Sequence, residues 1–466
     1  MKVDYLICGA GATGLSFLDV ILTETDATVA IADRRDAPGG HWNDAYPFVR
    51  LHQSSSFYGV CSRPLNTPRL ATGGFNAGLF ELSTKSEILH YFHDLMENTY
   101  LPSGRVTYFP MSEHIGEGRV SSLITGKVTD IEIGKKLVNA GLWGDLGSIP
   151  STHTRPFDVA AGVECIPPND LPQRAAGHDT FTVIGAGKTG MDAIIWLLGR
   201  GVEPANITWV RPNDYWLFHR EKIVNHPDFF DSSIASFQAE LTAFGTASTV
   251  AEYCERMEKS GMWHRIDPEV WPTKFHAAVC SNTEIEALRQ VTDVLRAGHV
   301  TRIEPERLIL QDAEVDVAPG RLYIDCTARA GTVLGQDAPP IFDGDTINLF
   351  MVRLFQPLFS AALIAFLEAK VPDDQMRKAC TNLVNFHDTP AQYIAEARQG
   401  MLNQGAWTQV PELKAWIDKS RLYAMNHLLA GLPSNDSEKL KKLSRFAPLS
   451  KAAVENIPRI LEHEGA

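Results

Sequence analysis

Two stretches of the chain repeat the same order of apolar and glycine-rich segments. The first begins with the apolar run VDYLIC at 3–8, continues through GAGATG and the periodic LSFLDVILTE, and ends with ATVAIAD at 27–33. The second runs from FTVI at 181–184 through GAGKTG and MDAIIWLLGR to ITWV at 207–210. Short apolar runs predict buried strands, and apolar residues three or four positions apart predict a helix. Each stretch therefore predicts a β–turn–α–β unit.

The rest of the pattern predicts helices and short strands around these two units. An amphipathic helix is expected over 82–101, and the segments RVTYFP, SSLITGKVTDIEI and KKLVNAGLW predict a small antiparallel meander. The proline-rich stretch 146–174 predicts a crossing between domains. Residues 226–299 are expected to be largely helical, as is the chain that follows a strand and turn at 321–331.

Each glycine of the first turn has its own task if that turn binds phosphate. Gly9 takes a tight turn, Gly11 lets the backbone approach a pyrophosphate, and Gly14 lets the helix pack closely on the strand. The free N–H groups at the start of the helix, where Ala12 and Thr13 lie, favour an anion. Because the turn joins a strand to a helix, it predicts a dinucleotide site. A glycine-rich turn that binds nothing is the alternative.

Asp33 and the residues after it carry a resemblance to a known family. Asp33 ends the second strand, where a carboxylate suits the hydroxyls of an adenosine ribose. Together with GAGATG and with APGGHWNDAYP at 37–47, it resembles the FAD-binding segment of class B flavin monooxygenases, which comprise the flavin-containing and Baeyer–Villiger monooxygenases. The resemblance implies FAD as a cofactor. It implies that these residues lie near that cofactor: Arg34, Gly39, Gly40, His41, Trp42 and Gln53.

The same resemblance implies that Arg50 and His52 are catalytic candidates beside the flavin. Two alternatives remain open: Trp42 is a core aromatic residue, and His52 is an ordinary loop histidine.

The second glycine turn predicts a second dinucleotide. Its binding residues are expected to be Gly185, Gly187, Lys188, Thr189 and Gly190. Arg211 follows the second strand here, where the first unit has Asp33, and an arginine favours a 2′-phosphate over a free ribose hydroxyl. This difference predicts NADPH rather than NADH, bound so that hydride passes to FAD.

Three further features bear on the resemblance. Arg211, Trp216 and Arg220 are spaced like the family's R-x-x-x-x-W-x-x-x-R, which implies that both arginines hold the phosphate, with solvated arginines as the alternative. Thr327 lies where such flavoproteins cross back to the FAD domain. Gln356 precedes an apolar helix whose positive end would point at the flavin, unless it is a plain buried helix. The family's F-x-G-x-x-x-H signature is absent before the second turn, which weakens the case for oxygen transfer.

Composition restricts the partners and the chemistry. The 466 residues include 43 Lys and Arg against 56 Asp and Glu, a net charge of −13, which disfavours nucleic acid and anionic membrane as partners. The seven cysteines form no CxxC, which argues against a redox dithiol or zinc knuckle and fits a reducing, cytoplasmic compartment. Histidines form no HxH or HExxH pair, so no metal is expected. No signal peptide or membrane span is expected.

These features predict an α/β fold with two Rossmann-like dinucleotide-binding domains, the second nested within the first and carrying a helical insert. Residues 1–165 would be the first part of the FAD-binding domain, and 166–320 the NAD(P)H-binding domain with its insert at about 226–299. Residues 321–466 would be the return segment and C-terminal helices. The oligomeric state is left open.

The expected function is that of an FAD-dependent, NADPH-reduced monooxygenase. It would use O2 to insert one oxygen atom into a small organic substrate, at nitrogen, sulfur or a ketone, through a peroxyflavin. Trp263, Trp271 and Phe275 are candidates for a lid over the substrate pocket. One alternative is an FAD-dependent dehydrogenase, oxidase or reductase without oxygen insertion. Another is a nucleotide-binding protein without turnover.

Overall fold

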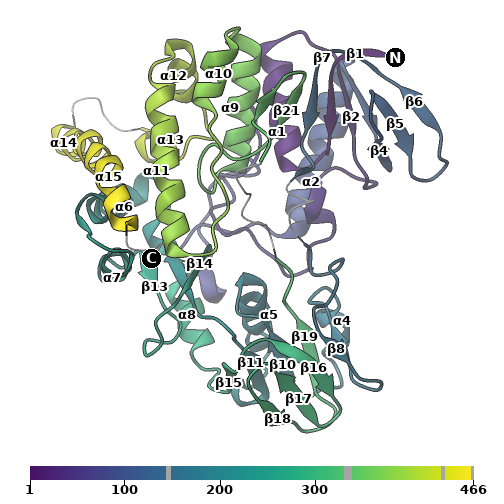
Figure 1. Ribbon diagram of the computed structural model, residues 1–466, viewed down its shortest axis with the longest axis vertical. Helices are drawn as coiled ribbons and strands as arrows, with labels where there is room; N and C mark the ends of the chain where they lie inside the picture. Colours follow the sequence, from purple (N-terminus) through teal and green to yellow (C-terminus); the bar gives the residue numbers. More distant parts are fainter. Residues whose placement is uncertain (143–147, 330–337, 432–435, 463–466) are drawn as a thin grey trace.

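The computed structural model describes residues 1–142, 148–329, 338–431 and 436–462 (Figure 1). Two mainly parallel sheets form its centre, and each contains one of the glycine turns. The first sheet consists, in spatial order, of β20 (Phe342–Asp343), β21 (Thr346–Asn348), β7 (Glu132–Asn139), β1 (Lys2–Cys8), β2 (Val29–Ala32) and β3 (Val106–Phe109). The second consists of β15 (Val294–Leu295), β11 (Ile207–Val210), β10 (Phe181–Ile184), β19 (Leu322–Asp325) and β9 (Cys165–Ile166).

Three smaller sheets accompany them. They are formed by β4 (Ser112–His114), β5 (Arg119–Ser122) and β6 (Val128–Asp130); by β8 (Asp158–Val159), β16 (Val300–Glu304), β17 (Arg307–Leu310) and β18 (Glu314–Asp316); and by β12 (Tyr215–His219), β13 (Trp263–His264) and β14 (Lys274–Cys280). The expected meander is confirmed for β4 to β6. It is wrong for the flanking segments, because β3 and β7 pair with the parallel first sheet.

The helices cover the sheets and build a separate bundle. They are α1 (Ala12–Glu24), α2 (Lys85–Leu95), α4 (Leu171–Arg174), α5 (Lys188–Leu198), α6 (Phe230–Thr246), α7 (Val250–Lys259), α8 (Asn282–Leu288), α9 (Pro357–Lys370), α10 (Asp374–Cys380), α11 (Pro390–Trp407), α12 (Pro411–Ile417), α13 (Ala424–Leu429), α14 (Ser437–Leu443) and α15 (Phe446–Leu461). The helix expected at 82–101 is confirmed as α2, which begins with a capping box between Thr84 and Glu87.

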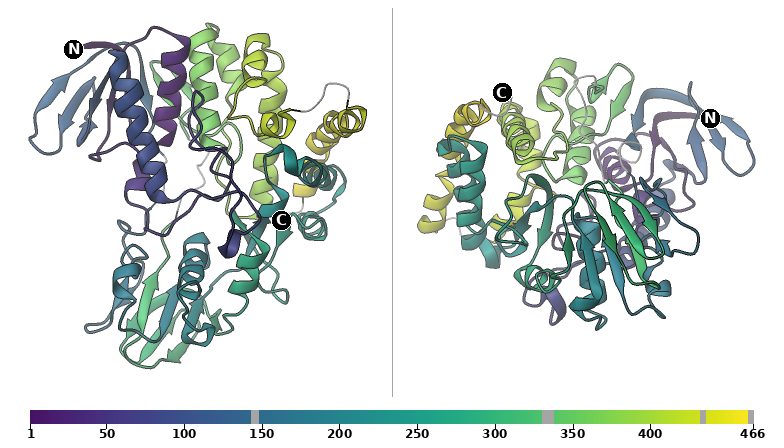
Figure 2. Two further views of the ribbon diagram at one scale, coloured as in Figure 1. Left: turned by 180° about the vertical axis from the view of Figure 1, so that it is seen from behind. Right: turned by 60° about the horizontal axis from the view of Figure 1, so that its bottom comes forward.

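The second unit is nested within the first, as the sequence predicts. The chain leaves the first sheet after β7, builds the second sheet, and returns at β20 and β21. Figures 1 and 2 show the two units one above the other, with α6, α7, α14 and α15 to one side. The strands β8 and β9 already belong to the second unit before residue 166, and β19 still belongs to it after residue 320. The second unit is therefore longer than the expected range.

The insert is only partly helical. Helices α6 and α7 confirm the expectation over 230–259, but residues 263–264 and 274–280 form β13 and β14 beside β12. Trp263 and Phe275 are 1% and 0% exposed, and their rings stack with centroids 4.2 Å apart. They belong to an aromatic core that joins the insert to α11 and α15. The lid expected of these two side chains is therefore wrong, and Trp271 alone of the three is exposed.

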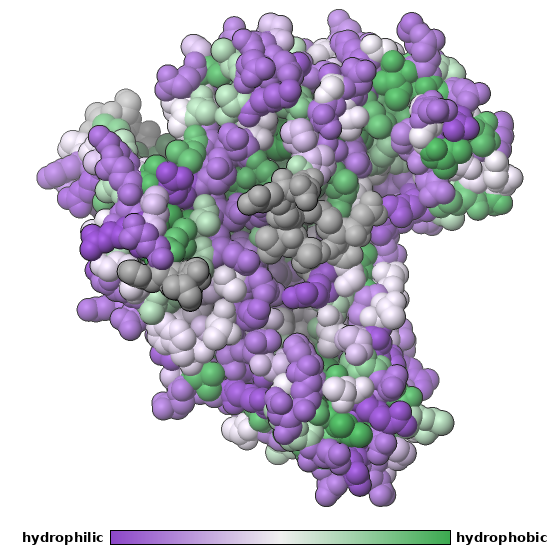
Figure 3. Space-filling view, viewed as in Figure 1, coloured by the Kyte–Doolittle hydropathy of each residue, from purple (hydrophilic) through white to green (hydrophobic). Residues whose placement is uncertain are grey.

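The visible face of the molecule is mostly hydrophilic, with apolar side chains gathered in small patches (Figure 3). Within the described ranges, no helix has the length and apolar character needed to cross a membrane. The seven cysteines all lie in these ranges, and none of them forms a disulfide. Among the same residues, no group of three or more His, Cys, Asp and Glu side chains is arranged to hold a metal ion.

His387 makes the aromatic core sensitive to acid. It is 6% exposed, its ring lies against Phe275, and neither ring nitrogen has a hydrogen-bond partner in the described chain. Burial lowers the pKa of His387 to about 3. Between the ordinary histidine value of about 6.5 and this lower value, only the unfolded chain binds the proton, so stability is lost as the pH falls through this window.

We expect His387→Phe to stabilise the fold, and to do so more at pH 5 than at pH 7.5. The substitution removes an unpartnered polar group, worth about 1–3 kcal/mol, and at pH 5 also a proton-linked penalty of about 2 kcal/mol. Urea unfolding at both pH values measures the difference. The exposed His90, changed to Phe, is the control. Equal losses of stability in the parent and in His387→Phe between the two pH values would contradict the prediction.

Candidate functional site

The two glycine turns have the same steric construction. A Cβ atom on Gly14 would lie 2.0 Å from the carbonyl oxygen of Gly9, and one on Gly190 would lie 2.2 Å from that of Gly185. Real Cβ atoms do not approach an oxygen so closely, so both positions require glycine. The last glycine of each turn thus brings α1 onto β1 and α5 onto β10, as the sequence predicts.

The first glycine of each turn lies against the chain that crosses between the units. Gly9 has φ +115° and Gly185 has φ +127°, in the region that favours glycine. A Cβ atom on Gly9 would lie 3.2 Å from the backbone of Ala140, which follows β7. On Gly185 it would lie 2.6 Å from the carbonyl oxygen of Cys326, which follows β19. Each turn is therefore in contact with the start of one crossing.

The middle glycines begin α1 and α5. Gly11 and Gly187 are the N-cap residues, and among the described residues no side chain caps either helix. A Cβ on Gly187 would meet nothing within 4 Å in the described chain, whereas one on Gly11 would lie 3.4 Å from Cα of Gly40. An uncapped helix start with a glycine leaves its N–H groups free for a phosphate. Ala12, Thr13 and Thr189 lie at these starts, as expected.

Asp33 holds the first turn in place. It is buried, and its Oδ2 accepts a hydrogen bond from the N–H of Ala10 at 2.6 Å, while Oδ1 accepts one from Arg35 at 2.8 Å. The sequence predicts that Asp33 contacts a ribose. The structure shows in addition that Asp33 binds the glycine turn itself, through the N–H of Ala10. Arg34 is exposed beside it.

Helices α1 and α9 lie side by side and run in the same direction (Figure 1). Near their starts, Ser16 Oγ donates to the carbonyl of Leu358 at 2.8 Å, and at their ends Lys370 Nζ donates to the carbonyl of Glu24 at 2.9 Å. Pro357 is the first residue of α9, and within the described chain this helix also lacks a side-chain cap. The positive ends of two helix dipoles therefore lie close together.

A hollow, here called the α9 hollow, opens at the start of α9. It is lined by Phe355, Gln356 and the first residues of α9, by Gln53 and residues 57–59, and by Leu422. Gln356 Oε1 is buried and has no hydrogen-bond partner among the residues described. Phe355 has φ +58°, a strained conformation for an aromatic residue, and is 39% exposed.

A second hollow, here called the Arg220 hollow, adjoins the first. It encloses about 390 Å³, part of it open to solvent. Gln53 and Phe57 line both hollows. The other apolar lining residues are Leu79, Phe80, Leu82, Ile223 and Val224, and the polar ones are His52, Ser54, Arg220 and Asn225. Gln53 and Phe57 thus form a wall shared by the two hollows.

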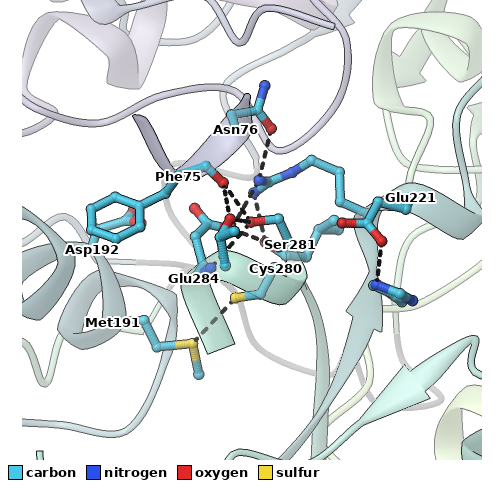
Figure 4. Close-up of polar contacts among 12 residues, drawn as sticks. Phe75, Asn76, Met191, Asp192, Glu221, Cys280, Ser281 and Glu284 are labelled. Carbon is cyan, nitrogen blue, oxygen red and sulfur yellow. Dashed lines mark hydrogen bonds and ion pairs between the residues drawn. The ribbon is translucent and has the colours of Figure 1, made fainter. Parts of the chain in front are cut away.

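Arg220 is buried in a network that joins the two units (Figure 4). Its Nη1 lies 2.8 Å from Glu284 Oε2 and donates to Asn76 Oδ1 at 3.1 Å. Ser281 Oγ donates to the carbonyl of Phe75 at 2.7 Å, so a loop of the first unit docks on the start of α8. The sequence predicts Arg220 at the coenzyme phosphate, whereas the structure places it in the wall of this hollow.

Lys188 is held inside the second unit. Its ammonium group pairs with Asp192, whose other oxygen accepts a hydrogen bond from Tyr46 at 2.7 Å. Burial by itself would lower the pKa of Lys188, but the carboxylates of Asp192 and Glu284 outweigh burial and raise it. Lys188 therefore stays charged, and it has a carboxylate partner of its own before any coenzyme binds.

His52 lies in the Arg220 hollow, and Arg50 does not. Burial, together with the cations of Lys188 and Arg220, lowers the pKa of His52 to about 3, so its ring is neutral at neutral pH. Arg50 is exposed, donates to the carbonyl of Leu82 at 3.0 Å, and is not among the described residues that line either hollow. Of the two catalytic candidates, the structure brings only His52 to the site.

Arg211 is buried at the end of β11. Its guanidinium lies over the ring of Trp209 and pairs with Asp214, and burial and Arg296 lower the pKa of Arg211 to about 10. Arg296 follows β15, the next strand, and reaches Asp214 at 3.0 Å and Asp267 at 2.7 Å. Arg296 was not predicted, because a strand of two residues leaves no periodic signal.

The remaining predicted residues lie around the first unit and the return crossing. Trp42 is buried in the core and donates from Nε1 to the hydroxyl of Tyr58 at 3.1 Å, and Tyr58 lines the α9 hollow. Gly40 lies on the first turn, and His41 is exposed beside it. Thr327 bonds through its N–H and hydroxyl to Asp325 at the end of β19. These contacts leave the predicted cofactor roles as predictions.

Comparison with known proteins shows the fold of the chain. No family model matches the sequence. Among solved structures, the polycyclic ketone monooxygenase of the thermophilic fungus Thermothelomyces thermophila aligns with 99% of this chain and 88% of its own, with a TM-score of 0.52 and 11% identity. The chain thus has the two-domain, Rossmann-like fold of a flavin-dependent monooxygenase, as its glycine turns predict.

Two mycobacterial proteins are much more similar in sequence. The uncharacterized proteins Rv2000 of Mycobacterium tuberculosis and Mb2023 of Mycobacterium bovis are each 38% identical over 462 residues, which is 99% of this chain and 85% of theirs. An identity of this size over nearly the whole chain means common descent, and the chain belongs to the protein family of Rv2000.

Proposed function

We propose that the protein is an FAD-dependent, NADPH-reduced monooxygenase that acts on a small organic substrate at nitrogen, sulfur or a ketone. One observation carries the proposal: the uncapped helices α1 and α9 lie side by side, and α9 begins at a hollow that shares Gln53 and Phe57 with the Arg220 hollow. Such a hollow suits a redox cofactor whose phosphates bind at one helix start and whose ring lies at the other.

The residues of the first unit fit FAD. Gly9 and Gly14 pack the turn tightly, Gly11 starts α1 without a side-chain cap, and Asp33 follows β2, where a ribose would bind. The buried, unpartnered Gln356 Oε1 offers an acceptor to an N–H group of the ring. When bound, FAD would take up hydride from a nicotinamide and pass electrons to oxygen.

The protein's own contribution would be position, charge and the exclusion of water. The start of α9 stabilises negative charge in its hollow, and Phe57 and Phe355 keep water out of it. We place the substrate in the Arg220 hollow, because its lining is mainly apolar and it shares Gln53 and Phe57 with the α9 hollow. His52, being neutral, donates or accepts a hydrogen bond there without adding charge.

The second unit would bind the nicotinamide coenzyme. The open space at Gly187 takes the pyrophosphate at the start of α5, and the arginines after β11 and β15 face the adenosine end. Because Arg211 is buried beside Asp214, we assign the larger share of 2′-phosphate recognition to Arg296, which is one-third exposed.

We expect Arg296→Ala to raise KM for NADPH about ten-fold and to leave KM for NADH nearly unchanged, because only NADPH carries the 2′-phosphate. Initial rates of coenzyme oxidation measure both constants. Arg302→Ala, which removes an exposed arginine paired with Glu304, is the matched control. If the two constants rise together, Arg296 supports the fold of the unit rather than the choice of coenzyme.

The test of the function is to reduce the FAD-loaded protein anaerobically with NADPH, mix it with O2 and follow the flavin spectrum. A transient band at about 370–390 nm before the oxidised spectrum returns supports a monooxygenase. A direct return with stoichiometric hydrogen peroxide points instead to an oxidase or reductase. If NADPH does not bleach the flavin at all, the assignment of the second unit fails.

A further inference from the structure

Arg421, in the connection between α12 and α13, binds a backbone segment far from it in the sequence. Its Nη2 donates to the carbonyls of Ser56 at 2.9 Å, Phe57 at 2.9 Å and Tyr58 at 3.1 Å, and its Nη1 donates to that of Val60 at 2.7 Å. One guanidinium group thus holds four of the carbonyls between residues 56 and 60.

This segment belongs to the wall between the two hollows. Phe57 lines both of them, and Tyr58 and Gly59 line the α9 hollow. Leu422, the residue after Arg421, also lines the α9 hollow. The ring of His427 lies edge-on to Phe57, with centroids 5.1 Å apart. The C-terminal helices therefore contribute to the site at the wall on which substrate and flavin would meet.

The charge of Arg421 is directed at the backbone rather than at a carboxylate. It forms no ion pair with the residues that the structure describes, and burial lowers its pKa. Asp19 holds the far side of the same segment, accepting hydrogen bonds from the N–H and hydroxyl of Ser62 at 2.8 and 2.5 Å. Hydrogen bonds to charged groups are stronger than neutral ones, so the partly buried Arg421 and the buried Asp19 together fix this loop.

We propose that Arg421 is a positioning residue that sets the shape of the wall between the α9 hollow and the Arg220 hollow. Only a planar guanidinium presents several donors at fixed angles, so lysine keeps the charge at this position but cannot hold all four carbonyls. The inference rests on the proposed function, since the wall matters most if flavin and substrate occupy the two hollows.

The experiment compares Arg421→Met and Arg421→Lys with the parent holoenzyme. Arg398→Met is the matched control, because Arg398 also donates to a carbonyl, that of Val454 at 3.1 Å, in the α11–α15 contact. Two quantities are measured: amide hydrogen exchange over 53–62, and the rate constant of flavin reduction by NADPH with the peroxide released per NADPH oxidised.

We expect Arg421→Met to exchange over 53–62 at least about ten-fold faster than the parent, to keep its flavin, and to be reduced about ten-fold more slowly with more peroxide released. Arg421→Lys should lie between the two, and it carries the test if the methionine variant does not fold. Arg398→Met should match the parent in both measurements.

Two results would overturn the proposal. One is exchange over 53–62 that matches the parent in both Arg421 variants. The other is faster exchange with unchanged reduction and peroxide yield, which would make Arg421 a purely structural residue. If NADPH does not reduce the parent, it is the proposed function that has failed, and the exchange comparison then decides alone whether Arg421 holds the wall.

Discussion

Gly187→Ala is expected to raise KM for NADPH at least about ten-fold while the fold and the bound flavin stay unchanged. A methyl group there meets nothing within 4 Å in the described chain, and φ at Gly187 is −75°, which alanine adopts freely. Alanine is a poorer N-cap than glycine, which lowers stability, but it also restricts the unfolded chain, which raises stability. The two effects nearly cancel, so the free energy of unfolding should stay within about 1 kcal/mol of the parent's. The methyl would instead occupy the space that a pyrophosphate needs.

Gly190→Ala is the informative comparison, three residues further along the same turn. Its Cβ would lie 2.2 Å from the carbonyl oxygen of Gly185, so helix and strand must separate, at a cost of about 1–3 kcal/mol or more. Thermal unfolding and NADPH kinetics of both variants, measured side by side, separate binding from stability. If Gly187→Ala keeps the parent's KM for NADPH, the second turn does not bind the coenzyme.

Glu284→Gln should destabilise the protein by about 3–5 kcal/mol, because it leaves the buried Arg220 without its counter-charge. The two side chains are 11% and 6% exposed and lie 2.8 Å apart. Glutamine can still form the capping box with Ser281 at the start of α8. The lost stability is therefore due to the missing charge and not to a missing helix cap. Urea unfolding at pH 7.5 measures the change.

A double variant makes the origin of that loss measurable. Combining Glu284→Gln with Arg220→Met removes both charges, and we expect it to recover at least half of the stability lost in the single variant. Glu132→Gln, which breaks the exposed pair with Lys2, should unfold at the parent's urea concentration. A double variant as unstable as the sum of the two single ones would show that the pair does not act as a unit.

Local patterns were sufficient to predict the two units. Each strand, turn and helix is contiguous in the sequence, and the steric needs of Gly14 and Gly190 arise within five residues of their own turn. The same holds for the Lys188–Asp192 pair, whose members are four positions apart on α5 and were therefore readable, and Arg211 lies only three positions from Asp214 in the loop after β11. The prediction that Lys188 and Arg211 bind phosphate did not take into account that Asp192 and Asp214 lie close enough to pair with them.

The remaining features depend on residues that are far apart in the sequence. Arg220 meets Glu284, and Arg421 meets the segment 56–60, only after distant elements of the same unit have packed together. The strand β14 has the sequence KFHAAVC, which is poor in β-branched residues, and it becomes a strand by pairing with β12. No periodicity in a single segment carries such information, so these parts of the site were missed.

If the two turns bind dinucleotides as proposed, the contacts of Gly9 with Ala140 and of Gly185 with Cys326 would couple that binding to the geometry between the units. Each glycine turn touches the first residue of a crossing, so the pivots about which one unit would rotate against the other would share atoms with the two proposed binding sites. A dinucleotide that shifts its turn would thus bias the rotation, and a rotation would alter affinity at the other turn. Since such linkage is reciprocal, the affinities for the two dinucleotides would depend on each other even without direct contact between them.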